Sequence, residues 1–423
     1  MWIKGGLIVD PASNIQEKAD LYIKDGIIAG IYPGGSQKSD EMVIDASGLW
    51  VLPGLIDMHV HLRDPGYEYK EDISSGSLAA AAGGVTTLAC MANTDPVNDN
   101  PSVTNYILDK ARQVSKVRIL PVGAVTKGLK GKELAEMGLM KKAGIVAVSD
   151  DGNPIEDSSL LRMALEYAST FGLTVMSHCQ DRNMCASGVM NEGALSSLLG
   201  LPGIPPISED IMVARDVLVS QYTGIPIHIT HISTQGSVRI IELAKHRGVK
   251  VTCDVTPHHL LLTEDRVRTY DTNAKMYPPL RNEADRLSLI AALKGSLIDC
   301  IATDHAPHAR DEKDLDFDIA PFGMIGLQTL LPSIMKIHLD YGIDFIRLLA
   351  CVTAHPARIF GIDGGEIKEG SRADITLFDP EAKWIFTEQD VKSKSKNSPF
   401  FGQEFTGRVV QTIVQGKTVY SGN

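Results

Sequence analysis

Two histidines one residue apart, His59 and His61, lie in a short segment that begins apolar and ends polar. On a β-strand alternate side chains share a face, so both imidazoles and the following Arg63 would point the same way. Two imidazoles on one face can bind a divalent cation from one side, and a guanidinium beside them suits a carboxylate. The segment therefore indicates a metal next to an anionic small substrate, although a chance pair of surface histidines has the same pattern.

The composition argues against several other classes of function. The chain has 423 residues, of which 43% are hydrophobic and 22% are charged, as in an ordinary globular protein. Its net charge is -11 and no basic cluster stands out, which argues against binding to nucleic acid or to an anionic membrane. The six cysteines form no CxxC pair, and the first residues do not resemble a signal peptide. These features predict a reduced, cytoplasmic protein without disulfides.

From residue 55 onward, apolar runs of strand length alternate with longer segments of helix length. Such alternation predicts an α/β fold, and about eight units over roughly 250 residues match a (β/α)8 barrel of the TIM type. An open doubly wound sheet is the alternative, but no Gly-rich phosphate loop follows the first strand. The predicted strands are 55–61, 85–91, 117–125, 144–149, 174–178, 226–231, 249–255 and 297–303. The predicted helices include 103–114, 132–143, 158–171, 208–223, 236–247 and 284–294.

The two ends of the chain have a different pattern, with short strands and tight turns. Asp25-Gly26 between apolar runs is a hairpin signal, and the first 50 residues suggest a small antiparallel sheet. We expect 1–52 and 363–423 to form one small flanking β-sandwich domain beside a barrel that spans 53–362. The charged segments 310–318 and 390–397 have the composition of mobile loops, and the first could cover the substrate as a lid.

In such a barrel, catalytic side chains lie at the carboxyl ends of the strands. The predicted strand ends carry His59, His61, Arg63, Asn93, Asp150, Asp151, His178, His231, Asp304, His305 and His308. One buried histidine or one helix-capping aspartate is ordinary, but neither explanation covers four histidines and two aspartates at the same level of five strands. Imidazoles and carboxylates are zinc ligands, and this number suits two ions that share a bridging ligand.

These residues resemble the amidohydrolase superfamily and, within it, the type I dihydroorotases. The resemblance covers nearly the whole chain, and its most specific segments are 59–66, 69–72, 91–94, 149–152, 302–308 and 394–400. It implies a metal-dependent barrel with a small β-domain. It also implies the reversible cyclisation of N-carbamoyl-L-aspartate to L-dihydroorotate in pyrimidine synthesis.

The resemblance also implies roles for individual residues. The metal ligands, for two zinc ions per subunit, are His59, His61, Asp151, His178, His231 and Asp304, with Asp151 as the bridge. Asp304 is also the catalytic base, which passes a proton from the attacking water to the departing ring nitrogen. The substrate-binding residues are His61, Arg63, Asn93, His308, Phe322 and Gly323. His305 is expected to be structural, and His258 and His259 to brace the loop after the seventh strand.

Two features separate this chain from related sequences. Hydantoinases carry a carboxylated lysine where this chain has Asp151, which disfavours that activity. Tyr277 stands before Pro-Pro-Leu-Arg where the family usually has an asparagine that touches the substrate. Another cyclic amidohydrolase, allantoinase-like or hydantoinase-like, is the alternative enzyme.

A non-catalytic scaffold for aspartate transcarbamoylase is the alternative of a different class. Non-catalytic relatives of this kind lack metal ligands, whereas this chain keeps all four histidines, so the scaffold is disfavoured. We expect a homodimer, with that transcarbamoylase as a candidate partner.

Overall fold

The structure is a computed structural model that describes residues 1–35, 41–185 and 187–422. Eight parallel strands lie side by side, from β7 at one edge to β16 at the other, and form the predicted barrel. In chain order they are β7 (Leu55–Val60), β8 (Val85–Cys90), β9 (Arg118–Gly123), β10 (Ala147–Val148), β11 (Thr174–Ser177), β14 (Ile227–Ile229), β15 (Val251–Val255) and β16 (Cys300–Ile301). Each strand overlaps its predicted range, and β10 and β16 are far shorter than predicted.

The first and last barrel strands meet through a few long-range contacts. Val60 and His305 form a parallel bridge, and His61 N donates to His305 O at 2.8 Å. The buried Asp57 carboxylate accepts from Thr303 N at 3.2 Å and from Thr303 Oγ1 at 2.6 Å. These contacts bring the carboxyl ends of β7 and β16 to the same place, where the sequence puts its densest polar motifs.

Helices cover the outside of the barrel, and some of them begin at residues whose side chains cap them. Asp157 accepts from the backbone N–H groups of Ser159 and Leu160 at the start of α4. The helix predicted over 208–223 is α7, which begins one residue earlier at Ile207, and the Ser208 hydroxyl donates to Pro205 O. The longer helices are α1 (Ile73–Ala82), α2 (Pro101–Val114), α3 (Met137–Ala143), α4 (Ser158–Ser169), α7 (Ile207–Thr223), α8 (Gln235–His246), α10 (Glu283–Lys294) and α12 (Leu330–Tyr341). The shorter ones are α5 (Arg182–Cys185), α6 (Ala194–Leu199), α9 (Pro257–Leu261), α11 (Arg310–Lys313), α13 (Phe345–Ala350) and α14 (Ala354–Phe360).

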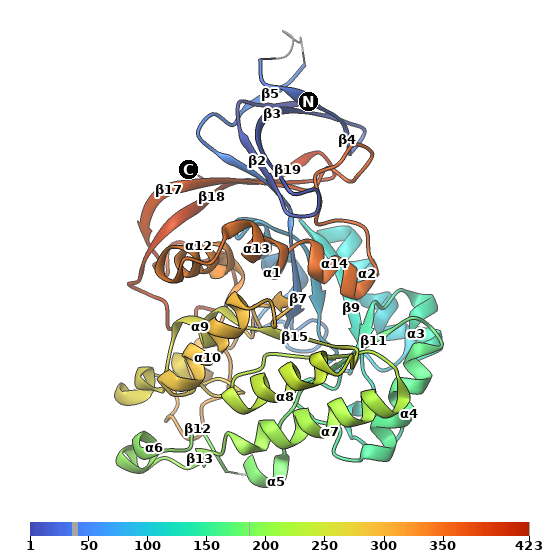
Figure 1. Cartoon of the computed structure of the whole chain (residues 1–423), viewed down its shortest axis with the longest axis vertical. Coiled ribbons are helices and arrows are strands. Elements are labelled where there is room, and N and C mark those ends of the chain that lie inside the picture. The colour runs from blue at the N-terminus through green and yellow to red at the C-terminus, as the bar shows by residue number, and fades with distance from the viewer. Residues whose placement is uncertain (36–40, 186, 423) are drawn as a thin grey trace.

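Strands from both chain ends build a second, curled sheet beside the barrel (Figure 1). Its order is β19 (Lys417–Ser421), β18 (Glu404–Val414), β17 (Ile375–Ile385), β6 (Trp50–Pro53), β2 (Leu7–Asp10), β3 (Ile15–Lys24), β1 (Trp2–Lys4) and β5 (Val43–Asp45). β4 (Ile27–Pro33) also pairs with β3 through the predicted Asp25-Gly26 turn. Because β1–β5 and β2–β6 are parallel pairs, the sheet is mixed rather than antiparallel as predicted. The division at residues 52 and 362 stays a prediction.

All six cysteines are buried and free. Among the described residues, no helix has the length and apolar character needed to cross a bilayer. A short two-stranded sheet, β12 (Met190–Asn191) with β13 (Gly203–Ile204), lies in the connection between β11 and α7.

Candidate metal centre

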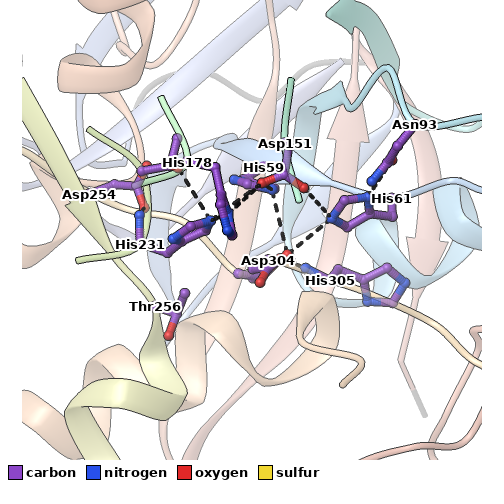
Figure 2. A network of polar contacts seen from close by, with 12 residues as sticks. His59, His61, Asn93, Asp151, His178, His231, Asp254, Thr256, Asp304 and His305 are labelled. Atoms are coloured by element: carbon purple, nitrogen blue, oxygen red, sulfur yellow. Dashed lines mark hydrogen bonds and ion pairs between the residues drawn. The ribbon is translucent and has the colours of Figure 1, made fainter. Parts of the chain in front are cut away.

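The ends of β7, β10 and β16 bring two histidines and two aspartates together (Figure 2). His59 Nε2 and His61 Nε2 each lie 3.4 Å from a carboxylate oxygen of Asp151. Asp304 Oδ1 lies 3.5 Å from His59 Nε2 and 3.1 Å from His61 Nε2. All four side chains are buried or nearly so, and they converge as the sequence predicted.

A second group shares Asp151 with the first. His178 Nδ1 and His231 Nε2, from the ends of β11 and β14, each lie 3.4 Å from Asp151 Oδ1. The two imidazole nitrogens are 3.0 Å apart, so they aim at nearly the same point. Each group could hold a metal ion, with one ligand atom from each residue and all of those atoms within 4.8 Å of one another. Asp151 is therefore placed between two potential cation sites.

The hydrogen bonds of these imidazoles fit metal binding. His61 Nδ1 lies 2.8 Å from Asn93 Oδ1, which makes Nδ1 the donor and leaves the Nε2 lone pair facing the two carboxylates. His59, which is fully buried, has no hydrogen-bond partner on either ring nitrogen in the described part of the chain. His178 Nε2 and His231 Nδ1 also lack one. Buried unpaired nitrogens around paired carboxylates are costly unless a cation completes the site, so the donor set fits a divalent metal.

The charges of the site depend strongly on one another. Burial acts to lower the pKa of His59, but the Asp151 and Asp304 carboxylates raise it to about 10. Burial acts to raise the pKa of Asp151, but the surrounding imidazoles, His59 foremost, hold it well below its usual value. Two buried carboxylates that stay ionised require positive charge nearby. A divalent cation supplies that charge without a proton.

The backbone of the site contains several residues in sparsely populated conformations. Arg63, His231 and Asp304 have φ values of 60°, 36° and 47°, in the left-handed region that non-glycine residues rarely adopt. The buried Asp254 carboxylate helps to hold one of them, because it accepts from His231 N at 2.8 Å and from His228 Nε2 at 2.9 Å. Such conformations persist where surrounding contacts fix them, which is common at functional sites.

The sequence did not distinguish the two neighbouring aspartates on chemical grounds, but their surroundings differ. Asp150 turns away from the histidines and accepts from Val125 N at 2.7 Å, from Thr126 N at 3.0 Å and from the Thr126 hydroxyl. Of these two neighbours, it is Asp151 that faces the imidazoles. Asp150 therefore holds the loop after β9.

Several of the residues expected to bind the substrate form a group next to the metal centre. Arg63 Nε donates to Pro307 O at 3.2 Å, and its Nη2 lies 3.3 Å from His308 Nε2. His308 Nε2 lies 2.8 Å from Phe322 O, so this nitrogen carries the proton, and burial lowers the pKa of His308 to about 2. His308 is thus neutral. Asn93 lies on the other side of His61, from which its amide oxygen accepts a hydrogen bond, and its contact with the substrate stays a prediction.

Tyr277, which stands where the family usually has asparagine, packs directly on the metal centre. Its ring stacks on that of His178 with centroids 5.1 Å apart and planes at 30°, and it lies 5.4 Å from the ring of Phe322. Burial raises the pKa of Tyr277, so its hydroxyl stays protonated. The aromatic ring of Tyr277 therefore lines the site beside His178.

Two supporting residues have the structural role that the sequence analysis predicted for them, and the roles of others were not predicted. His259 bonds Thr256 Oγ1 at 2.7 Å and Pro278 O at 3.1 Å, which braces the loop that carries Tyr277 as expected. His305 Nε2 lies 3.4 Å from the buried Glu71, and its Nδ1 accepts from Gly326 N at 3.0 Å, in keeping with a structural role. The supporting roles of the following residues were not predicted: Asp57, Asp254, His228 and Asn397. Asn397 lies in segment 394–400, which carries part of the family resemblance, but no role was inferred for it. The bonds of these residues to other parts of the chain could not be inferred from the sequence.

The charged segment 310–318 is anchored to the rest of the molecule. It contains α11, and the buried Lys313 Nζ donates to Thr272 O at 2.9 Å and to Pro321 O at 2.7 Å. Glu312 pairs with Lys70 at 2.7 Å. The expectation of a solvated loop is therefore wrong for its central part, where Lys313 is 6% exposed.

Comparison with known proteins places these residues in a family. Residues 48–237 match the family model described as dihydro-orotase-like, and residues 339–420 match the amidohydrolase family. A protein from Geotalea daltonii named dihydroorotase is 52% identical over 99% of both chains. One of the same name from Geobacter metallireducens is also 52% identical, over 99% of both chains.

Among solved structures, the L-hydantoinase of Arthrobacter aurescens matches 99% of this chain and 96% of its own, with 26% identity and a TM-score of 0.88. A D-hydantoinase structure matches 99% of this chain and 95% of its own, with a TM-score of 0.86 and 23% identity, and shares the fold.

Proposed function

From the premise that this chain belongs to the dihydroorotase family of amidohydrolases, we propose how its own side chains carry out the reaction. The reaction is the reversible cyclisation of N-carbamoyl-L-aspartate to L-dihydroorotate, and in the other direction the hydrolysis of a cyclic amide. The observation that carries the proposed site is the Asp151 carboxylate, which faces four imidazole nitrogens at 3.4 Å. The family and this buried cluster indicate a metal cofactor.

We propose that the metal is zinc and that each subunit holds two ions. The ligands of one would be His59, His61, Asp151 and Asp304, and those of the other Asp151, His178 and His231. Imidazole and carboxylate donors suit zinc, and Asp151 has an oxygen for each site. When bound, such ions lower the pKa of a water molecule and polarise an amide carbonyl.

The protein groups around the centre handle the proton and orient the substrate. Asp304 lies beside both β7 histidines and is positioned to accept a proton from the attacking water and to deliver it to the departing ring nitrogen. Asn93 holds His61 in the tautomer whose Nε2 is free. A polar surface next to the metal centre, which we call the polar wall, is formed by Arg63, His308 and the Phe322-Gly323 backbone. The guanidinium of Arg63 suits the carboxylate of the substrate.

A hydantoinase-like activity is the second candidate, because the L-hydantoinase of Arthrobacter aurescens shares the fold at 26% identity. The chemistry at one position argues against it. The chain carries Asp151 where the hydantoinases it resembles use a carboxylated lysine. The lysine must be carboxylated before it can bridge two metal ions, whereas the aspartate already carries a carboxylate.

The test is a ring-opening assay of the purified, zinc-loaded protein with dihydroorotate, allantoin and hydantoin, together with metal analysis. We expect turnover of dihydroorotate in large preference to the other two, with about two zinc ions per chain. His178→Ala and Asp304→Asn should each abolish turnover without unfolding the protein. Full activity in either variant would refute the proposed site, and preference for hydantoin would favour the second candidate.

We also propose that the chain is a cytoplasmic homodimer and can associate with aspartate transcarbamoylase. The cytoplasmic location is supported by six buried free thiols. The two assembly proposals are supported by the family resemblance alone. Light scattering of the purified protein, alone and with the transcarbamoylase, would test both.

A further inference from the structure

Segment 393–398 joins loops that follow two different barrel strands, and the proposed function gives it no role. At one end, Ser393 Oγ donates to Glu71, and Lys394 N donates to the same carboxylate at 3.1 Å. Ser395 Oγ donates to Lys70 O at 2.6 Å. These bonds fix the segment to the loop after β7. Its other end, at Asn397, reaches the loops after β16.

Asn397 is 3% exposed, and both polar atoms of its side-chain amide are hydrogen-bonded. Its Oδ1 accepts from His308 N at 3.1 Å. Its Nδ2 donates to Ala306 O and to Gly323 O, both at 3.0 Å. Its backbone carbonyl accepts from Ile325 N at 2.8 Å. A carboxamide supplies one acceptor and two donors in one plane, a combination that no acid, hydroxyl or apolar side chain of similar size offers.

The two loops that Asn397 joins carry the polar wall next to the metal centre. His308 belongs to one loop and Gly323 to the other, and His308 Nε2 donates across to Phe322 O. The loops already touch, because a Cβ on Gly323 would lie 2.7 Å from Ala306 Cβ and 2.8 Å from Ala306 O. Their spacing is therefore set by the backbone contact and by the Asn397 amide.

The side chains of the six proposed metal ligands make no bond with this segment in the described part of the chain. Asp151, His178 and His231 follow β10, β11 and β14 and lie away from it. His59, His61 and Asp304 lie at the ends of β7 and β16, next to the loops that the segment contacts, but their side chains bond one another, Asp151 and Asn93 instead. A change at Asn397 should thus alter the polar wall and leave the metal centre intact. We propose that Asn397 is a positioning residue for substrate binding, which holds His308 and Gly323 at the spacing that the substrate requires. This inference rests on the proposed function.

Two variants test the role of Asn397. Asn397→Ala removes all three side-chain bonds. Asn397→Asp keeps the size and the acceptor for His308 N, but it sets carboxylate oxygens against two carbonyl oxygens. For both variants we expect the KM for dihydroorotate to rise about tenfold or more, since one lost buried bond can account for a factor of this size. We expect a smaller fall in kcat and an unchanged zinc content per chain.

Ser398→Ala is the matched control. Ser398 is also buried, and its Oγ accepts from Phe400 N at 3.2 Å, so the variant loses a neighbouring buried bond that does not involve the two loops. We expect it to lower the melting temperature while keeping the wild-type KM.

Three results would overturn the proposal. The first is a wild-type KM in a folded Asn397 variant. The second is an equal rise of KM in Ser398→Ala. The third is failure of both Asn397 variants to fold while the control folds, because Asn397 would then serve stability alone. Absence of dihydroorotate turnover in the wild-type protein would instead refute the proposed function.

Discussion

Asp150 and Asp151 have the same side chain at adjacent positions, yet their surroundings assign them opposite tasks. Asp150 accepts three hydrogen bonds from Val125 and Thr126, whereas Asp151 faces the imidazoles of both metal groups. The sequence could predict a carboxylate at this strand end from its position after β10. Which of the two faces the histidines depends on local backbone direction, so the residues alone could not decide it.

The same substitution at Asp150 and at Asp151 compares the two surroundings directly. We expect Asp151→Asn to lose bound metal and turnover, because an amide provides one neutral oxygen where a shared carboxylate is needed. We expect Asp150→Asn to keep the metal and to lose about 1–3 kcal/mol of stability, since a buried hydrogen-bond network is disturbed. Metal analysis and denaturant unfolding of both variants are the measurements. Equal metal loss in the two would contradict the assignment.

The ring of Tyr277 gives a second test at the scale of a residue. Tyr277→Ala removes the aromatic surface that lies on His178, and a pair of this kind contributes about 0.5–1.5 kcal/mol. We therefore expect zinc binding to weaken by roughly twofold to tenfold, as measured by competition with a chelating dye. Tyr277→Phe keeps the ring and should bind zinc like the wild type. If the phenylalanine variant is equally weakened, the hydroxyl rather than the ring is responsible.

At the scale of elements, the alternation of apolar strands and amphipathic helices was enough to predict every barrel strand. The prediction overestimated the lengths of β10 and β16, which have two residues each. Apolar residues that flank a strand cannot be distinguished in the sequence from apolar residues within it. The prediction also treated 310–318 and 390–397 as loops defined by charge. Charge patterning could not reveal that Lys313 and Asn397 are buried, since both donate to backbone carbonyls of segments that are distant in sequence.

The anchoring of α11 by Lys313 makes stability depend on pH. Burial, with Lys275 nearby, lowers the pKa of Lys313 to about 7, and Asp271 and Glu312 oppose this only in part. The unfolded chain holds the proton up to its ordinary value of 10.5, so between pH 7 and 10.5 it binds more protons than the folded chain. The free energy of unfolding contributed by Lys313 should thus rise with pH across this window.

Lys313→Met isolates this contribution. We expect the difference in unfolding free energy, wild type minus variant, to increase from pH 7 to pH 10, measured by denaturant unfolding at each pH. Groups common to both proteins cancel in that difference. A difference that stays flat or falls with pH would show that the buried ammonium is not the titrating group.

At the scale of the whole molecule, the proposed ligands come from the ends of five strands, β7, β10, β11, β14 and β16. Binding at such a site ties together parts of the barrel that are distant in sequence, and any ligand that binds only the folded state stabilises it. We expect chelation to lower the melting temperature measured by calorimetry, and added zinc to restore it. His178→Ala should show a smaller response to chelation, whereas an equal response would place the stabilising metal elsewhere.

Anomalous X-ray diffraction at the zinc absorption edge, on crystals of the zinc-loaded protein, would show whether the proposed ligands hold two zinc ions. We expect two peaks on opposite sides of the Asp151 carboxylate. One should lie about 2.0–2.1 Å from nitrogens of His59 and His61, and the other at that distance from nitrogens of His178 and His231. Peaks away from these side chains, or none in active crystals, would contradict this prediction.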